Sequence, residues 1–348
     1  MRFIYVTCLI LVISLMSLGA QQERKAVISG IVSDSTTGTP LENVNVFLSF
    51  TTIGASTGLE GNFSLTNVPP GAYDLVVSRV GYEREVVNIR IAASETLHYG
   101  IRLKPHILQE EEVNIIAENP EEWQKNLKRF VRAFLGTTEN ADKCQILNPE
   151  VLDFRFDDNT DTLLAATDSV LRIENKALGY RLFIMLRSFV WNIQLDCGHY
   201  LIYPRFDELR SHDAKELTGW QENRSKSFRG SLKHFLRALY AGTIDDEKFS
   251  ISSGSLKNLR FYGHQVCPDE IVFDNSTPIK TILFPDYLRV EYLGRGFTKE
   301  RITTSLMILK QAYALIDGRG NLLNPLSLEI YGSWSYDRIA EMLPLDEE

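Results

Sequence analysis

Apolar and polar residues alternate along much of residues 24–106, and this pattern predicts strands. Apolar side chains occupy every second position of 44–48 and again of 73–77. One face of each strand should therefore lie in a core and the other in water. Residues that favour turns separate the apolar runs, most clearly at 34–38 and at 69–71. Short strands separated by turns predict an antiparallel β-sandwich over 24–106.

Residues 107–143 are predicted to form a linker that holds one short strand, at 113–116, and one helix. Asn119 is a favourable N-cap, and Pro120 suits the first helical position. Apolar residues then recur at helical spacing until Gly136, which ends the helix. We expect this helix to dock its apolar stripe on the domain that follows.

Strand patterns return in residues 144–348, and helical patterns interrupt them. The longer helix is expected at 225–240 and a short one at 335–342. Residues 180–194 are long enough, and alternate regularly enough, for a pair of strands. Strands with a few helices predict an α+β domain over 144–348. The predicted fold class is therefore mainly β, a β-sandwich followed by an α+β domain.

The helix expected at 225–240 has an apolar face and a basic flank. The apolar face, which should be buried against a sheet, consists of Phe228, Leu232, Phe235, Leu236 and Leu239. Arg229, Lys233 and Arg237 recur at i, i+4 and i+8 beside that face. Such charges are typical of a solvated helix surface, and they also suit an anionic partner. We keep both interpretations and name these three residues as possible partner-binding residues.

Residues 1–20 predict a secretory signal peptide. Arg2 precedes an apolar run over 3–18, and Gly19 and Ala20 supply the small residues of a cleavage site. The run is shorter than the ~20 apolar residues that a membrane span needs. We therefore expect a protein secreted across the inner membrane, periplasmic or outer-membrane associated, with no membrane span in the mature chain.

Net charge and cysteine content bear on the class of partner and on the disulfides that the chain could form. The 348 residues include 37 basic and 45 acidic ones, a net charge of −8, so the chain has no overall field that would attract nucleic acid. Cys144, Cys197 and Cys267 remain once the leader is removed, an odd number for an oxidising compartment. One disulfide and one buried thiol are expected, and the sequence does not select the pair.

Two stretches of the predicted sandwich carry a family resemblance. GIVSDSTTGTPLENVNV, which begins at Gly30, and TGLEGNFSLTNVPPGAYDLVVSRVGYE, which ends at Glu83, resemble a carboxypeptidase regulatory-like domain. The resemblance covers about a quarter of the chain. It implies a transthyretin-like sandwich, a fold also grouped with carbohydrate-binding-like folds. It implies no peptidase activity, because the module is an accessory attached to peptidases, receptors and surface proteins.

The rest of the chain shows a second resemblance. Residues 146–152, 174–180 and 230–237 resemble the C-terminal part of secreted bacterial proteins that carry the same module before a domain of unknown function. This implies a common organisation and assigns no chemistry.

Two short motifs suggest chemistry that their surroundings do not support. Residues 54–58 match the G-x-S-x-G nucleophile elbow, but a hairpin pattern follows them where the elbow needs a helix. Asp157, Asn159 and Asp161 are spaced as in a calcium loop, yet the glycine and the final glutamate of that loop are missing. A polar turn is the expected structure there.

Four residues offer a possible zinc site. Cys197-x-His199 and His264-x-x-Cys267 would supply two sulfur and two nitrogen ligands. A disulfide between Cys197 and Cys267 explains the same cysteines with fewer assumptions. The metallocarboxypeptidase motif H-x-x-E is absent from the sequence. We assign no catalytic residue, no cofactor and no metal from the sequence.

The expected function is that of a non-catalytic cell-envelope protein that serves recognition or assembly. Its partner should be an envelope protein or a glycan. One alternative is an envelope hydrolase whose site lies in 144–348. The other is an accessory protein of an outer-membrane receptor, since 111–117 loosely resembles the junction that follows this module in such receptors.

Overall fold

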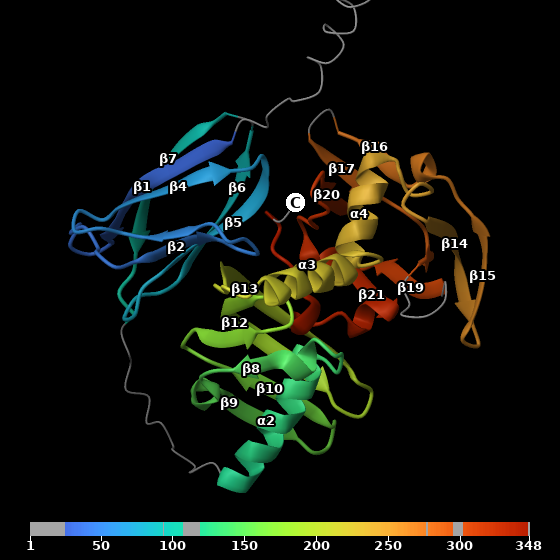
Figure 1. Ribbon diagram of the computed structural model, residues 1–348, viewed down its shortest axis with the longest axis horizontal. Coiled ribbons are helices and arrows are strands. Elements are labelled where there is room, and N and C mark those ends of the chain that lie inside the picture. Colours follow the sequence, from blue (N-terminus) through green and yellow to red (C-terminus); the bar gives the residue numbers. More distant parts are fainter. Residues whose placement is uncertain (1–24, 93, 107–118, 276–277, 295–301, 347–348) are drawn as a thin grey trace, which may run out of the picture.

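The computed structural model describes residues 25–92, 94–106, 119–275, 278–294 and 302–346. Within them the chain is mostly β, with five sheets and three α-helices (Figure 1). None of these three helices has the length and apolar character needed to cross a bilayer. The fold class predicted from the sequence, a transthyretin-like sandwich followed by an α+β part, is confirmed. The predicted signal peptide and the strand predicted at 113–116 lie outside the described residues.

The N-terminal unit is a sandwich of two sheets. One sheet has the order β4-β1-β7 and the other β3-β2-β5-β6. The alternation seen in the sequence places Val46, Leu75 and Val77 in the core between the sheets. β1 and β7 run parallel, so the sandwich departs from the expected antiparallel pattern at that pair. The strands are β1 (Ala26–Asp34), β2 (Asn45–Leu48), β3 (Gly54–Ser56), β4 (Asn62–Val68), β5 (Gly71–Ser78), β6 (Glu85–Ile91) and β7 (Thr96–Leu103).

The middle unit packs α2 (Pro120–Leu135) on a six-stranded sheet. As predicted, Asn119 caps the helix by accepting a hydrogen bond from a backbone N–H of the first turn (3.1 Å). Phe130 and Phe134 of α2 lie against Phe189 of the sheet, with ring centroids 4.8 and 6.0 Å apart. The sheet has the order β8-β11-β12-β10-β9, and β13 pairs with β12. The strands are β8 (Cys144–Ile146), β9 (Asp153–Asp157), β10 (Thr162–Ala166), β11 (Leu171–Asn175), β12 (Tyr180–Asn192) and β13 (Cys197–Glu208).

The C-terminal unit holds α4 (Leu232–Ala241) against two sheets. Phe235 and Leu239 of α4 are 0% and 1% exposed, in one cluster with Trp334. The sheets have the orders β15-β14-β18-β19-β21 and β16-β17-β20. α3 (Ala214–Phe228) precedes α4 and lies between the middle and C-terminal units (Figure 1). The strands are β14 (Phe249–Lys257), β15 (Arg260–Gln265), β16 (Val272–Asp274), β17 (Ile279–Ile282), β18 (Tyr287–Leu293), β19 (Ile302–Leu309), β20 (Ala314–Asp317) and β21 (Leu328–Gly332).

The single long helix predicted in this region is two helices, which corrects the sequence interpretation. The chain turns at Gly230, whose φ is 74°. A Cβ at this position would lie 2.4 Å from the ring of Tyr292, so the turn requires glycine. Ser231 then serves as the N-cap of α4. Because of the turn, Phe228 and Leu232 are half-buried, whereas the remaining apolar positions of the predicted face are buried.

The short helix predicted at 335–342 is also different in the structure. Two 3₁₀ turns, η5 (Ser333–Tyr336) and η6 (Ile339–Glu341), take its place. Asp337 and Arg338 between them have extended backbone, so no continuous helix forms.

The sandwich docks on the middle unit through apolar packing and backbone hydrogen bonds. Phe47 and Val76, on the outer face of β2 and β5, form a buried cluster with Met185 of β12. Just after β2, the backbone N–H of Phe50 donates to the carbonyl of Pro204 on β13 (2.7 Å). The sandwich is therefore seated directly on the strands of the middle unit.

Residues 343–346, here called the C-terminal tail, connect the sandwich with the C-terminal unit. The backbone N–H of Leu345 donates to the carbonyl of Phe50 in the sandwich (2.7 Å). Lys233 Nζ of α4 donates to the carbonyl of Pro344 (2.7 Å). The tail thus contacts two units that are distant in sequence.

Candidate functional site

A pocket of about 720 Å³ opens where α3 ends and α4 begins. Arg229, Lys233 and Arg237 all line it, so the structure brings the three predicted partner-binding residues to one concavity. Arg229 is exposed, and the other two are half-buried. The loop at 246–248 and Leu343 of the C-terminal tail complete much of the rim. We call this concavity the basic pocket.

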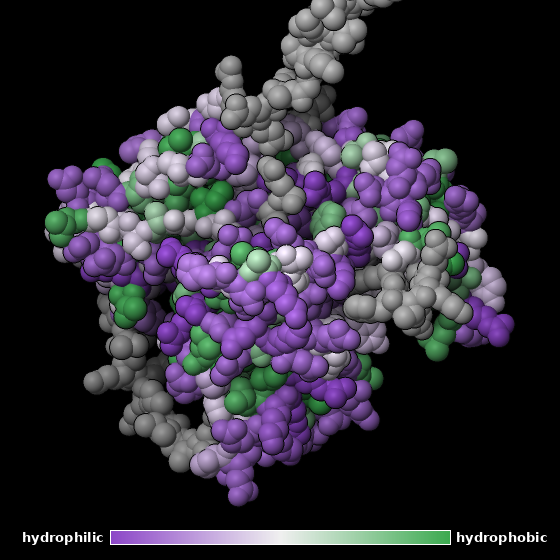
Figure 2. Space-filling model, viewed as in Figure 1, coloured by the Kyte–Doolittle hydropathy of each residue, from purple (hydrophilic) through white to green (hydrophobic). Residues whose placement is uncertain are grey.

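Two guanidinium groups of the basic pocket are left without a carboxylate. Within the described residues, neither Arg229 nor Arg237 pairs with an aspartate or glutamate. Arg237 lies over the ring of Phe228, 5.3 Å from its centroid. The surface over α3 is predominantly hydrophilic (Figure 2). Since guanidinium groups match carboxylates and phosphates in geometry, the pocket is suited to an anion.

The other charged residues of the pocket are Arg224, which has a structural role, and Asp246, Glu247 and Lys248 of the loop. Arg224 donates to the carbonyl of Leu178 (2.8 Å) and pairs with Glu208 (3.2 Å), which ties α3 to the middle unit. Asp246 and Glu247 place carboxylates on the loop side of the pocket. The lining is therefore mixed in charge, with cations in excess.

His234 fixes the inner wall of the basic pocket. The backbone N–H of Gly230 donates to its Nδ1 (3.0 Å), so the ring proton sits on Nε2, which donates to Glu247 (3.0 Å). Burial lowers the pKa of His234, and Glu247 opposes that shift only in part. Both ring nitrogens are engaged, so the neutral imidazole positions Glu247 and the turn between α3 and α4.

We expect the stability of the chain to fall as the pH is lowered below about 6.5, in part because of His234. Its pKa is lower in the folded chain than in the unfolded one, so the unfolded state binds more protons in this range. The contribution is complete above the unfolded pKa and is lost as the pH falls through the folded pKa.

Thermal melts between about pH 7.5 and about pH 5, together with an NMR titration of the imidazole, measure this effect. A His234→Asn variant should lose part of the pH dependence. A His199→Asn variant, changed at an exposed histidine on β13, should keep it. An imidazole that titrates above its ordinary pKa of 6.5 would contradict the prediction.

A second pocket of about 580 Å³ lies between the sandwich and the C-terminal unit. Its walls come from β5 and β6 on one side and from α4 and the residues near η5 and η6 on the other. It shares Phe228, Lys233 and Leu343 with the basic pocket. The two cavities are therefore neighbours separated by these side chains.

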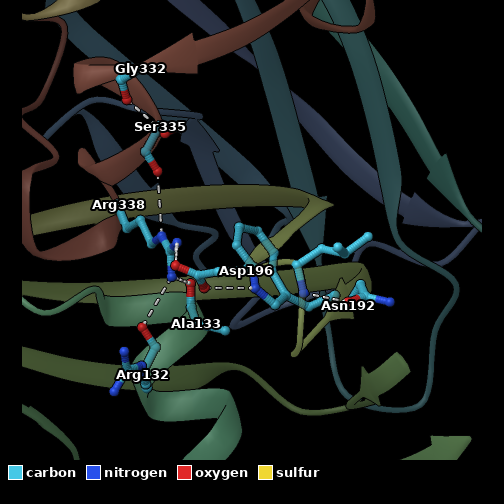
Figure 3. A network of polar contacts seen from close by, with 9 residues as sticks. Arg132, Ala133, Asn192, Asp196, Gly332, Ser335 and Arg338 are labelled. Atoms are coloured by element: carbon cyan, nitrogen blue, oxygen red, sulfur yellow. Dashed lines mark hydrogen bonds and ion pairs between the residues drawn. The ribbon is translucent and has the colours of Figure 1, made fainter. Parts of the chain in front are cut away.

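A buried polar network secures the end of the chain to the middle unit (Figure 3). Arg338 is 6% exposed, and its Nη1 donates to the carbonyls of Arg132 and Ala133 at the end of α2 (3.2 and 3.0 Å). Its Nη2 pairs with Asp196 (3.1 Å), and its guanidinium lies 4.5 Å from the ring centroid of Trp191. Arg338 thus donates to two carbonyls of the last turn of α2, of which that of Arg132 also accepts from the N–H of Gly136.

The nucleophile-elbow match at 54–58 folds as part of the sandwich. Its first three residues form β3, an edge strand. The buried hydroxyl of Thr57 donates to the carbonyl of Leu41 (2.6 Å) and accepts from the N–H of Val44 (3.0 Å). A strand follows the motif, β4, and not the helix that the elbow requires.

The calcium-like spacing at 157–161 forms the turn between β9 and β10, as expected. The carboxylate of Asp157 accepts hydrogen bonds from the N–H of Asn159 (3.0 Å) and from the hydroxyl of Thr160 (3.0 Å). These bonds lower the pKa of Asp157. Its oxygens are thus engaged within the turn itself.

The four residues weighed for zinc do not come together. His199 lies on β13 of the middle unit, and His264 lies on β15 of the C-terminal unit. In the part of the chain that the structure describes, no group of three or more histidine, cysteine, aspartate or glutamate side chains is placed to hold a metal ion.

The predicted disulfide is wrong for this structure, in which Cys144, Cys197 and Cys267 are all free. Cys144 on β8 and Cys197 on β13 lie level with opposite ends of β12, about 40 Å apart at ~3.3 Å per residue, whereas a disulfide needs Cα atoms within ~7 Å. Cys267 belongs to the C-terminal unit. Burial raises the pKa of the Cys144 thiol to about 12, with a smaller contribution from Glu341.

Several pocket residues were not identified from the sequence. Phe228 was assigned to the core, and His234 was given no role. Asp246 and Glu247 follow α4 in an acidic run, and that run is the one local signal for the loop side of the pocket. Leu343 comes from the tail, and no local pattern connects it with α4.

Comparison with known proteins identifies the N-terminal unit. Residues 28–115, about a quarter of the chain, match the family model of the CarboxypepD_reg-like domain. The sandwich is therefore a carboxypeptidase regulatory-like domain, as the resemblance implied. No curated protein sequence matches the chain.

Three solved structures are similar to parts of the chain. A cohesin–X-dockerin complex mutant from Acetivibrio cellulolyticus is 21% identical, covers 22% of this chain and 56% of its own, and has a TM-score of 0.20. The 5-hydroxyisourate hydrolase of Klebsiella pneumoniae is 23% identical over 23% of this chain and 91% of its own, with a TM-score of 0.20. A DUF3823 family protein from Parabacteroides merdae is 9% identical over 54% of this chain and 82% of its own, with a TM-score of 0.20. The chain thus spans about half the length of the first of them, and at these TM-scores the likenesses carry no functional argument.

Proposed function

We propose that this chain is a non-catalytic recognition protein of the cell envelope, secreted across the inner membrane by its signal peptide. The carboxypeptidase regulatory-like sandwich is an accessory module in this proposal. The C-terminal unit binds an envelope protein or glycan through the basic pocket. The observation that supports this most directly is the convergence of Arg229, Lys233 and Arg237 on one concavity. Two guanidinium groups that line one pocket without a carboxylate partner are typical of a site that recognises an anion.

The role of His234 also supports binding over catalysis. A general base needs a ring nitrogen within reach of a substrate proton, and both nitrogens of this ring are hydrogen-bonded inside the protein. His234 therefore builds the shape of the pocket.

Capture of an envelope partner tests the proposal. We expect the wild-type chain to retain a specific component of an envelope extract, and an Arg229→Glu/Arg237→Glu variant to lose it because an anionic partner is then repelled. Lys233 is left unchanged, since it also holds the tail. The matched control is Arg155→Glu/Arg172→Glu, two exposed arginines on β9 and β11.

Equal capture by the wild-type chain and the pocket variant would contradict the proposal. Hydrolysis of a peptide, ester or glycoside by the purified chain would favour the envelope hydrolase instead. Loss of capture in both double variants would show an effect of net charge alone.

A further inference from the structure

We infer that the basic pocket binds an acidic sugar, a small ligand that carries one carboxylate or phosphate beside several hydroxyl groups. The inference rests on the proposed recognition function and deepens it by naming the chemical class of the ligand. It follows from the size of the pocket, its two arginines without a carboxylate partner, the carboxylates of its loop side and its apolar wall.

The dimensions of the pocket indicate a small ligand. Its volume of about 720 Å³ falls within the range of ~300–1,000 Å³ that is typical of small-molecule sites. A folded protein partner generally buries a broad surface of ~800 Å² on each side, mostly without such a concavity. The ligand, or the part of a glycan that enters the pocket, is therefore about the size of one or two sugar rings.

The cations indicate a negative charge on that ligand. Arg229 and Arg237 face the pocket without a carboxylate partner in the described residues. Arg237 is held in place by its position over Phe228. A guanidinium group binds a carboxylate or a phosphate through two parallel hydrogen bonds, which fixes the direction of the anion as well as its charge.

The loop side of the pocket argues against a polyanion and for hydroxyl groups. Asp246 and Glu247 outnumber Lys248 there, so this loop would repel a ligand charged along its whole length, such as a nucleic acid. Carboxylates accept hydrogen bonds from hydroxyl groups, and Gln221 and Ser225 of α3 add further donors and acceptors. One anionic group on one side and several hydroxyls on the other is the pattern of a uronic acid or a sugar phosphate.

An apolar wall completes the complementarity. Phe228, the last residue of α3, and Leu343 of the C-terminal tail supply apolar lining to the pocket. The C–H face of a sugar ring packs on such a surface, while the hydroxyls at its edge reach the polar groups.

The pocket is fixed before a ligand arrives. Trp334 Nε1 donates to the carbonyl of Gly230 (2.7 Å). The backbone N–H of Gly230 in turn donates to Nδ1 of His234 (3.0 Å). The turn that carries Arg229 is therefore anchored on both sides. Because these residues are already ordered in the free chain, the loss of conformational entropy on ligand binding is small.

Calorimetric titration of the full chain with four probes tests the inference: glucuronate, glucose 6-phosphate, glucose and inorganic phosphate. We expect glucuronate or glucose 6-phosphate to bind at least about tenfold more tightly than both glucose and inorganic phosphate, the value of one charged hydrogen bond. The acidic sugar that binds identifies carboxylate or phosphate as the anionic group. Arg229→Gln/Arg237→Gln should weaken this binding by at least about tenfold, and Arg155→Gln/Arg172→Gln should not change it.

Other outcomes overturn the inference. Glucose binding as tightly as both acidic sugars would show that the arginines do not select charge. Inorganic phosphate binding as tightly as the sugars would show a plain anion site. If neither acidic sugar binds while the wild-type chain still captures its envelope partner, the ligand class is wrong and the recognition function stands. If an acidic sugar binds at the pocket but no envelope partner is captured, the proposed recognition of an envelope component fails instead.

Discussion

Replacing Phe235 with alanine is expected to lower the free energy of unfolding of the C-terminal unit by about 3–5 kcal/mol. The side chain is fully buried, and its ring lies 5.4 Å from those of both Phe249 and Trp334. Removing it leaves a cavity between α4 and the sheets that rigid neighbours fill poorly. Since a domain is stabilised by only ~5–15 kcal/mol, this is a large fraction of the total.

Chemical denaturation followed by hydrogen exchange measures the loss and locates it. Amides of β14 to β21 should lose protection, whereas those of β1 to β7 should keep it, because the sandwich has a separate core. Tyr262→Ala, on β15 and 55% exposed, is the matched aromatic control and should change stability by less than about 0.5 kcal/mol. A loss spread evenly over all three units would contradict the prediction.

Replacing Arg338 with leucine is the second change with a large expected effect, about 2–4 kcal/mol. The carbonyl of Ala133 would lose the guanidinium donor, that of Arg132 would keep only the N–H of Gly136, and Asp196 would lose its cation. We place the cost below that of a fully buried pair because Asp196 is 46% exposed and water can reach it.

The matched control is Arg181→Leu, which removes an arginine–carboxylate pair of similar geometry on the surface. Arg181 lies 2.6 Å from Glu174 and is 43% exposed, so the loss should be below about 1 kcal/mol. Denaturation midpoints of the two variants compare the pairs directly. Equal losses would show that burial of Arg338 adds nothing.

The sandwich could be predicted from sequence because its signals are local. Its strands alternate with a period of two, and its turns carry their own glycines and prolines. The segment 180–194 shows the limit of that approach. It is predicted to form two strands and forms one, β12, because its pairing partners β10, β11 and β13 all lie outside the segment. Which strands pair is decided by the tertiary structure and not by the local sequence pattern.

The candidate site could likewise be predicted only in part, because some of its residues carry a local sequence signal and others do not. Arg229, Lys233 and Arg237 were selected from their spacing on one helix, although a turn separates the first from the other two. Gly230 and Ser231 are recognisable as a helix stop and start, but the ring of Tyr292 that enforces the turn comes from β18. Tyr292 and Leu343 complete the pocket from segments far along the chain, and local periodicity cannot identify them.

The C-terminal tail has a consequence for the order of assembly. The N–H of Thr52 in the sandwich donates to the carboxylate of Asp346 (3.0 Å), across 294 positions of the chain. During synthesis this bond forms only after residue 346 has left the ribosome, long after the last sandwich strand has been made. The sandwich must therefore fold and persist while its final anchor is still missing. Phe47 and Val76 face water until Met185 and the rest of the middle unit have been made and folded, and any delay before that point prolongs the time in which these two side chains can promote aggregation.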